Sequence, residues 1–74
     1  MHKLPSLSAQ SVIRILEKKG FVLKRITGSH YIFAHPETKK RVSVPYRRDD
    51  VAKGTLLEIL KEAGISREEF EDLL

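Results

Sequence analysis

The chain has 74 residues and a net charge of +4, and its sequence contains no cysteine. The length fits one small domain over residues 1–74, and the lack of thiols excludes both a disulfide framework and a thiolate zinc site. No apolar run approaches the roughly 18 residues that a membrane span needs, and no signal-peptide core follows Met1, so we expect a cytoplasmic protein without a membrane segment.

The charge is distributed unevenly along the chain. Residues 1–48 contain 11 Lys or Arg and 2 acidic residues, a balance of +9, whereas residues 49–74 contain 3 and 8, a balance of −5. A positive surface of this kind attracts polyanions, phosphate backbones above all. A solvated basic surface without a partner is the alternative interpretation, and the segregation favours nucleic acid.

The first predicted element is a helix that Ser8 caps and Gly20 ends. Its apolar positions follow the helical spacing i, i+3, i+4, i+7: Ala9, Val12, Ile13 and Leu16. Phe21 follows the glycine and is placed to fold back onto the last helical turn.

Three antiparallel strands are predicted next, over residues 21–27, 30–35 and 40–44, and Pro45 ends the last. Gly28 and Ser29 suit a two-residue hairpin turn with a positive φ at the glycine, which would pair Thr27 with His30. This register predicts one face with Phe21, Leu23, Arg25, Thr27, His30, Ile32 and Ala34, and another with Val22, Lys24, Ile26, Tyr31, Phe33 and His35. Both faces are mixed, so the pattern leaves open which of them carries His30.

Two helices complete the chain. The first has Leu56, Ile59, Leu60 and Ala63 on one stripe, with either a Thr55/Glu58 capping box or a start at Asp50, and it ends at Gly64. A short acidic helix follows the capping pair Ser66 and Glu69. The predicted fold class is therefore α+β: a two-layer α-β-β-β-α(-α) arrangement with helices on one face of the sheet, as in double-stranded-RNA-binding domains.

His30 is the candidate catalytic residue, because it follows a tight turn at a strand end where a ligand can reach it. An imidazole changes its charge near neutral pH and can serve as general acid or base. RNA supplies its own nucleophile, the 2′-hydroxyl, so we expect neither a metal nor another cofactor. Gly28 and Ser29 would permit close approach of the RNA, and nearby cations would hold its phosphates: Lys24, Arg25, Arg47 and Arg48. A strand-end histidine that merely packs on its neighbours is the alternative.

Other chemistry-bearing residues receive blander interpretations. His2 and His35 are assigned no role, and the three histidines are not spaced as a metal site. The acidic cluster at 68–72 fits a solvated helix face. Phe33 is assigned to the core, whereas Tyr46, between Pro45 and Arg47, is the better candidate for a base or ribose contact.

Seven segments together resemble the HicA toxin family, in order and at the spacing of that family: residues 15–22, 28–30, 35–36, 42–45, 54–56, 59–64 and 66–70. The resemblance implies a fold similar to the double-stranded-RNA-binding domain and activity as a translation-independent mRNA interferase. It associates cleavage with His30 and implies a HicB antitoxin that covers the site. Many members carry a histidine two residues after the Val-Pro, where this chain has Arg47.

Two other functions compete with a ribonuclease. A non-catalytic RNA-binding module would bind RNA in a salt-sensitive way without cutting it, although Arg47, Arg48 and Lys53 form a thin basic cluster for duplex RNA. A pure partner-binding protein would use the basic surface for an acidic, antitoxin-like protein.

Overall fold

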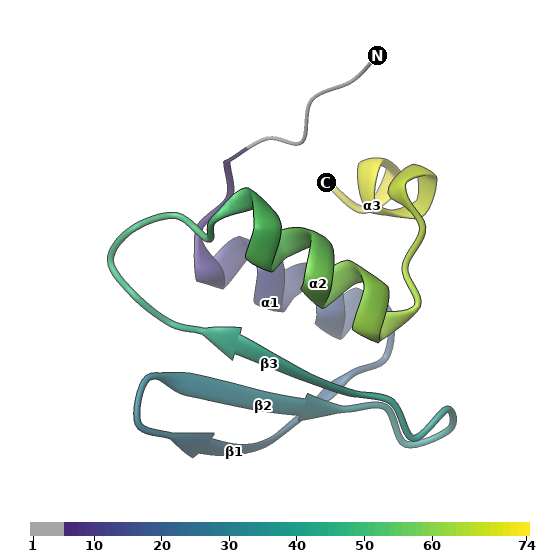
Figure 1. Ribbon diagram of the computed structural model, residues 1–74. Coiled ribbons are helices and arrows are strands. Elements are labelled where there is room, and N and C mark those ends of the chain that lie inside the picture. The colour runs from purple at the N-terminus through teal and green to yellow at the C-terminus, as the bar shows by residue number, and fades with distance from the viewer. Residues whose placement is uncertain (1–5) are drawn as a thin grey trace.

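The computed structural model describes residues 6–74, and it confirms the predicted α+β class and the order of elements (Figure 1). His2, to which the sequence assigns no role, lies outside the described residues. The elements are α1 (Ala9–Lys18), β1 (Val22–Thr27), β2 (His30–Ala34), β3 (Arg41–Pro45), α2 (Lys53–Ala63) and α3 (Arg67–Leu73). The strands form one antiparallel sheet in the order β1-β2-β3, and the helices lie on one side of it.

Helix α1 begins and ends as its sequence predicts. The Ser8 side chain accepts a hydrogen bond from the backbone N–H of Ser11, at 3.2 Å. At the other end Gly20 has a φ of +93°, and the N–H of Phe21 donates to the carbonyl of Leu16 at 3.0 Å. This closure returns the buried Phe21 ring to the core. Ile15 is also buried, although the predicted stripe did not include it.

The predicted β1–β2 hairpin is confirmed near its turn and wrong farther away. Thr27 pairs with His30 and Arg25 pairs with Ile32, but Leu23 pairs with Phe33, so Lys24 is an extra residue in β1. This β-bulge shifts the pleat by one position. Leu23 therefore shares a face with Phe33 rather than with His30, as does the buried Phe21, whereas Val22 pairs with Ala34 on the face of His30. The predicted faces of the first half of β1 are thus reversed.

Helix α2 begins at Lys53, so neither predicted start is correct. Ala52 is the N-cap and makes no side-chain hydrogen bond to the first turn. Gly64 ends the helix with a φ of +72°, as expected. The capping box of α3 is confirmed, because Ser66 accepts from the N–H of Glu69 while the Glu69 side chain accepts from the N–H of Ser66.

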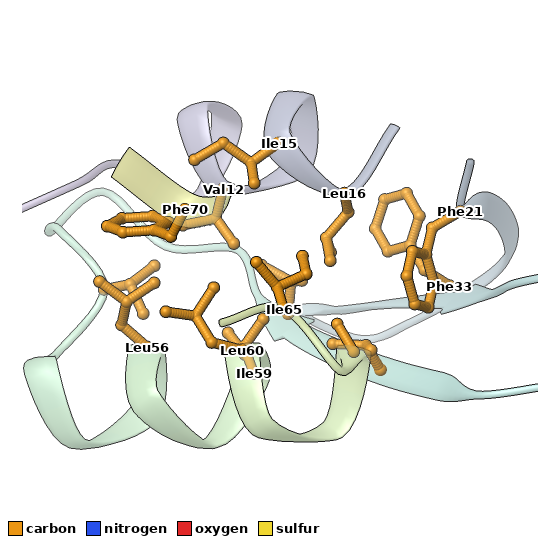
Figure 2. Packing of buried hydrophobic residues seen from close by; sticks show 14 of the residues in the cluster. Val12, Ile15, Leu16, Phe21, Phe33, Leu56, Ile59, Leu60, Ile65 and Phe70 are labelled. Carbon is orange, nitrogen blue, oxygen red and sulfur yellow. The ribbon is translucent and has the colours of Figure 1, made fainter. Parts of the chain in front are cut away.

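The core lies between the sheet and the helices. Figure 2 shows side chains of α1 and α2 directed into the space between them, together with Phe70 of α3. Every element except β1 contributes a side chain that is under 2% exposed: Val12, Leu16, Phe33, Val42, Val44, Leu56, Ile59 and Phe70. Each such side chain stabilises the fold by roughly 1.5–3 kcal/mol relative to exposure. No helix within residues 6–74 is long and apolar enough to cross a membrane.

Candidate functional site

The turn that presents His30 has the predicted form. Gly28 has a φ of +57°, and the strands re-pair at Thr27 and His30. A positive φ at the first of two turn residues is typical of the type II′ hairpin, which requires glycine there. The N–H of Tyr46 donates to the Ser29 carbonyl at 2.6 Å, so the segment after β3 is tied to the turn.

His30 lies on the sheet face that points away from the helices. Phe33, Val42 and Val44 are buried beneath the helices, and residues on neighbouring strands that pair directly share a face. His30 is an odd number of positions from Phe33 and pairs with Pro45, so it falls on the opposite face. Its side chain is exposed. The structure thus shows which sheet face carries His30, which the mixed pattern of polar and apolar residues in the strands did not decide.

His30 opens onto a hollow of about 470 Å³ between the end of the sheet, the connection from β3 to α2 and the start of α2. Figure 1 shows this connection as a wide loop. The lining residues come from all three parts: His30, Ser43, Pro45, Arg47, Asp49, Asp50, Val51, Ala52 and Thr55.

The structure brings only some of the predicted site residues to this hollow. Arg47 lines it with His30, and Gly28 and Ser29 form the adjacent turn. Lys24, Arg25 and Arg48 are exposed but are not among its lining residues. Arg25 does share the face of His30, because its partner Ile32 is two positions along β2, whereas Lys24 is the bulged residue. Of the four cations predicted to lie near His30, only Arg47 lines the hollow.

The hollow also contains two carboxylates that the sequence pattern does not predict there. Asp49 and Asp50 line it together with Thr55, whereas the sequence pattern indicates Asp50 only as one of two helix starts. Their formal charges outweigh that of Arg47, so the hollow is mixed in charge rather than uniformly basic. The adjacency of Arg47-Arg48 and Asp49-Asp50 in one loop was the available signal, since a short loop keeps such residues close together.

The start of α2 adds a second positive feature. Ala52 provides no side-chain acceptor, and the first turn of α2 contains no acidic residue. The free N–H groups of that turn carry the positive end of the helix dipole, which favours anions. Ala52 and Thr55 lie in the lining, so this helix end faces the same space as His30 and Arg47.

His35 has a structural role that sequence reasoning did not assign. Its Nδ1 accepts hydrogen bonds from the N–H groups of Glu37 and Thr38, at 3.1 and 3.2 Å. Nε2 therefore carries the proton and donates to the Lys19 carbonyl, 3.0 Å away. The ring also meets Phe21 edge-on at 5.2 Å. His35 thus connects the β2–β3 turn to the end of α1. Within residues 6–74, no three His, Asp or Glu side chains gather as a metal site would require.

Comparison with known families gives a match that spans most of the chain. A family model described as the HicA toxin of bacterial toxin–antitoxin systems matches residues 9–65. The matched span includes the Gly28-Ser29 turn, His30 and every other residue that lines the hollow. No curated protein matches the chain at the sequence level.

Proposed function

The chain belongs to the HicA toxin family of bacterial toxin–antitoxin systems, and from this premise we propose that it is a metal-independent endoribonuclease that cleaves messenger RNA with His30. The observation that carries the proposal is an exposed histidine at a hollow that also holds Arg47 and the start of α2. Cleavage of messenger RNA in the cytoplasm would inhibit translation, which is how such a toxin would act.

The proposed reaction uses the 2′-hydroxyl of the RNA as nucleophile. Its oxygen attacks the adjacent phosphorus, the bond from phosphorus to the 5′-oxygen breaks, and the products are a 2′,3′-cyclic phosphate and a 5′-hydroxyl. One group must take the 2′ proton and another must give a proton to the 5′-oxygen. His30 performs one of these transfers. Asp49 or Asp50 in the same hollow is available as the second group.

Phosphate binding completes the proposed site. Arg47 would pair with the phosphate that is cleaved, because a guanidinium donates two parallel hydrogen bonds to phosphate oxygens. Arg25, on the same sheet face as His30, would contact a neighbouring phosphate. Lys24 and Arg48 would act farther out, through the general attraction of a polyanion, and Gly28 and Ser29 would let the RNA approach the turn.

The test is RNA cleavage by the purified chain in the presence of a chelator. We expect the wild type to cut, and His30→Ala to lose roughly 10²- to 10⁴-fold in rate, the usual contribution of one acid or base. The control is His35→Ala, which removes the imidazole that directly follows β2, assayed at a temperature at which circular dichroism shows both variants to be folded. If His30→Ala cuts as fast as the wild type, His30 is not the catalytic group.

A non-catalytic RNA-binding module would give a different result in the same assay. It would bind RNA without producing 2′,3′-cyclic ends, and neither histidine variant would change the products. The opposed charges at the hollow count against that alternative, because Asp49 and Asp50 weaken phosphate binding without a compensating use.

Membership in this family implies an antitoxin partner. We propose that the partner is a HicB-type protein and that it inhibits the chain by covering the hollow around His30. The addition of such a protein should then stop cleavage and slow hydrogen exchange in the turn at 28–29 and the loop at 46–52; inhibition without protection there would contradict the proposed location.

A further inference from the structure

Two tyrosines stack near the turn that carries His30. The rings of Tyr31 and Tyr46 have centroids 4.6 Å apart and planes inclined by 20°. Tyr31 lies in β2, one residue after His30, and Tyr46 directly follows β3. Tyr31 pairs with Val44 across the strands, and Tyr46 is its diagonal neighbour, at a separation that aromatic side chains can bridge.

The backbone holds this ring pair in a fixed place relative to the hollow. The Tyr46 N–H is bonded to the carbonyl of Ser29, as noted above. Its neighbours on both sides, Pro45 and Arg47, line the hollow together with His30. Tyr46 is therefore one residue from the proposed phosphate ligand and directly across the ladder from the proposed catalytic turn.

The ring pair lies at the edge of the core, because the half-buried Tyr31 packs against the core and Tyr46 is exposed. Tyr46 is 39% exposed, and Ile26, the cross-strand partner of Tyr31, is 53% exposed. Tyr31 covers one face of the Tyr46 ring, so a flat ligand that stacks on Tyr46 must use the opposite face. An aromatic ring backed by a second ring loses little conformational freedom when it binds such a ligand.

We propose that the open face of Tyr46 stacks with an unpaired base of the RNA, next to the phosphate that is cleaved at His30. The proposal rests on the proposed function. Every base presents a π-face, so aromatic stacking binds single-stranded RNA with little dependence on sequence. Tyr46 is thus a substrate-binding residue, with Tyr31 as the residue that positions its ring.

The placement of the ring pair and His30 on opposite faces of the sheet favours a substrate that is single-stranded at this point. Tyr31 shares the face of Phe33, whereas His30 lies on the opposite face. An RNA that contacts both must pass around the end of the sheet, past the Gly28-Ser29 turn and Tyr46. A flexible single strand can follow this path, but the bases of an A-form duplex remain stacked and paired inside a rigid helix.

The test is binding of a short labelled RNA that carries 2′-O-methyl groups and so cannot be cleaved by its own 2′-oxygen. Affinity is measured by fluorescence anisotropy with the full chain and with Tyr46→Leu, which keeps apolar contact with Tyr31 but removes the aromatic face. We expect Tyr46→Leu to weaken binding roughly 5- to 150-fold, the range for loss of one stacked base. Tyr46→Phe should bind like the wild type. Leu57→Ala, an exposed apolar residue on α2, is the matched control.

An abasic scan of the same RNA identifies the stacked base. Removal of one particular base should weaken binding to the wild type and leave binding to Tyr46→Leu unchanged, because the two changes remove the same contact. Equal affinity of Tyr46→Leu and Leu57→Ala, or no binding of the RNA at all, would overturn the base site. Cleavage of unmodified RNA, measured in parallel, separates the proposals: Tyr46-dependent binding without cleavage refutes only the nuclease, and cleavage without Tyr46 dependence refutes only the base site.

Discussion

His30 is the first residue of β2 and His35 directly follows that strand, and the two have opposite environments. His30 is exposed at the hollow, beside the Gly28-Ser29 turn and the charged side chains of Arg47, Asp49 and Asp50. His35 is half-buried, and both of its ring nitrogens have backbone partners. Two identical side chains can therefore be separated experimentally, one by activity and the other by stability.

We expect His35→Ala to lower the free energy of unfolding by about 1–3 kcal/mol, because it leaves the Lys19 carbonyl and two turn N–H groups without their partner. His30→Ala should change the same quantity by less than about 0.5 kcal/mol, as exposed substitutions usually do. Urea unfolding followed by circular dichroism measures both. Equal destabilisation by the two variants would show that the His35 hydrogen bonds contribute little.

Gly20, which follows the end of α1, lies against the His35 ring. A Cβ at residue 20 would lie 2.9 Å from Nε2 of His35, and Gly20 already has a φ that favours glycine. The sequence alone indicates the positive φ, because a glycine that follows a basic helix end commonly terminates the helix. The sequence does not indicate the close contact with His35, because His35 approaches Gly20 only in the folded chain, where β2 ends beside the end of α1.

At the scale of elements, local signals predicted what local interactions determine. The caps of α1 and α3 and the turn at Gly28 involve residues within five positions of one another, so their chemistry is visible in the sequence. The bulge at Lys24 and the start of α2 after Ala52 are different, since tertiary packing sets both. Leu23 faces the side of Phe33 because the Phe21 ring is committed to the core, a reason that alternation within β1 cannot reveal.

The lining of the hollow, too, is only partly predictable from local sequence. Its histidine and its arginine were identified from residue type and position, and Arg47 does line it with His30. Asp49, Asp50 and Thr55 reach it only because the loop after β3 bends back to α2. Lys24, Arg25 and Arg48 were grouped with His30 on charge alone, and charge does not determine how far along a strand or loop a side chain lies.

Helix α3 is held in place by contacts with α1 as well as by its own capping box. It has only 7 residues, too few for a stable isolated helix, and its Phe70 is fully buried. Lys19 of the α1 terminus pairs with Glu69, and the Lys18 ammonium donates to the Leu73 carbonyl at 3.0 Å. The pKa of the Glu69 carboxyl is lowered by the hydrogen bond from Lys19, then by the backbone N–H of Ser66 and the charge of Lys19.

This lowered pKa predicts an acid-sensitive contribution to stability. Glu69 ionises more readily in the folded chain than at its ordinary value near 4.5, so its contribution is complete above that pH and is lost as the pH falls through the lowered folded value. Urea unfolding between pH 2 and 6 should show a smaller loss for Glu69→Gln than for the wild type. Glu71→Gln, an exposed acid on the same helix, is the control and should follow the wild type. Parallel curves for wild type and Glu69→Gln would contradict the assignment.

At the scale of the whole molecule, the basic and acidic residues that are separated along the sequence also lie on different parts of the fold. The hairpin of β1 and β2 carries Lys24 and Arg25 and no acidic residue, whereas the short helix α3 carries four acidic residues, Glu68, Glu69, Glu71 and Asp72. Figure 1 places α3 beyond α1 and α2, on the side away from the sheet. Charge is therefore distributed unevenly over the molecule, and the phosphate backbone of a nucleic acid is attracted toward the sheet rather than toward α3.

This polarity can be measured as a salt dependence. Each phosphate neutralised on a single strand contributes about −0.7 to the slope of log affinity against log salt concentration, because condensed counterions are released. If Arg47 binds one phosphate, Arg47→Gln should reduce the magnitude of the slope by about 0.7, measured with the uncleavable RNA between 50 and 200 mM salt, concentrations over which such slopes are resolved. Arg67→Gln removes the same charge from the start of α3, where no phosphate contact is proposed, and should leave the slope unchanged. Equal slopes for the two variants would mean that Arg47 acts only through the net charge of the molecule, and the proposed phosphate contact at the hollow would then be wrong.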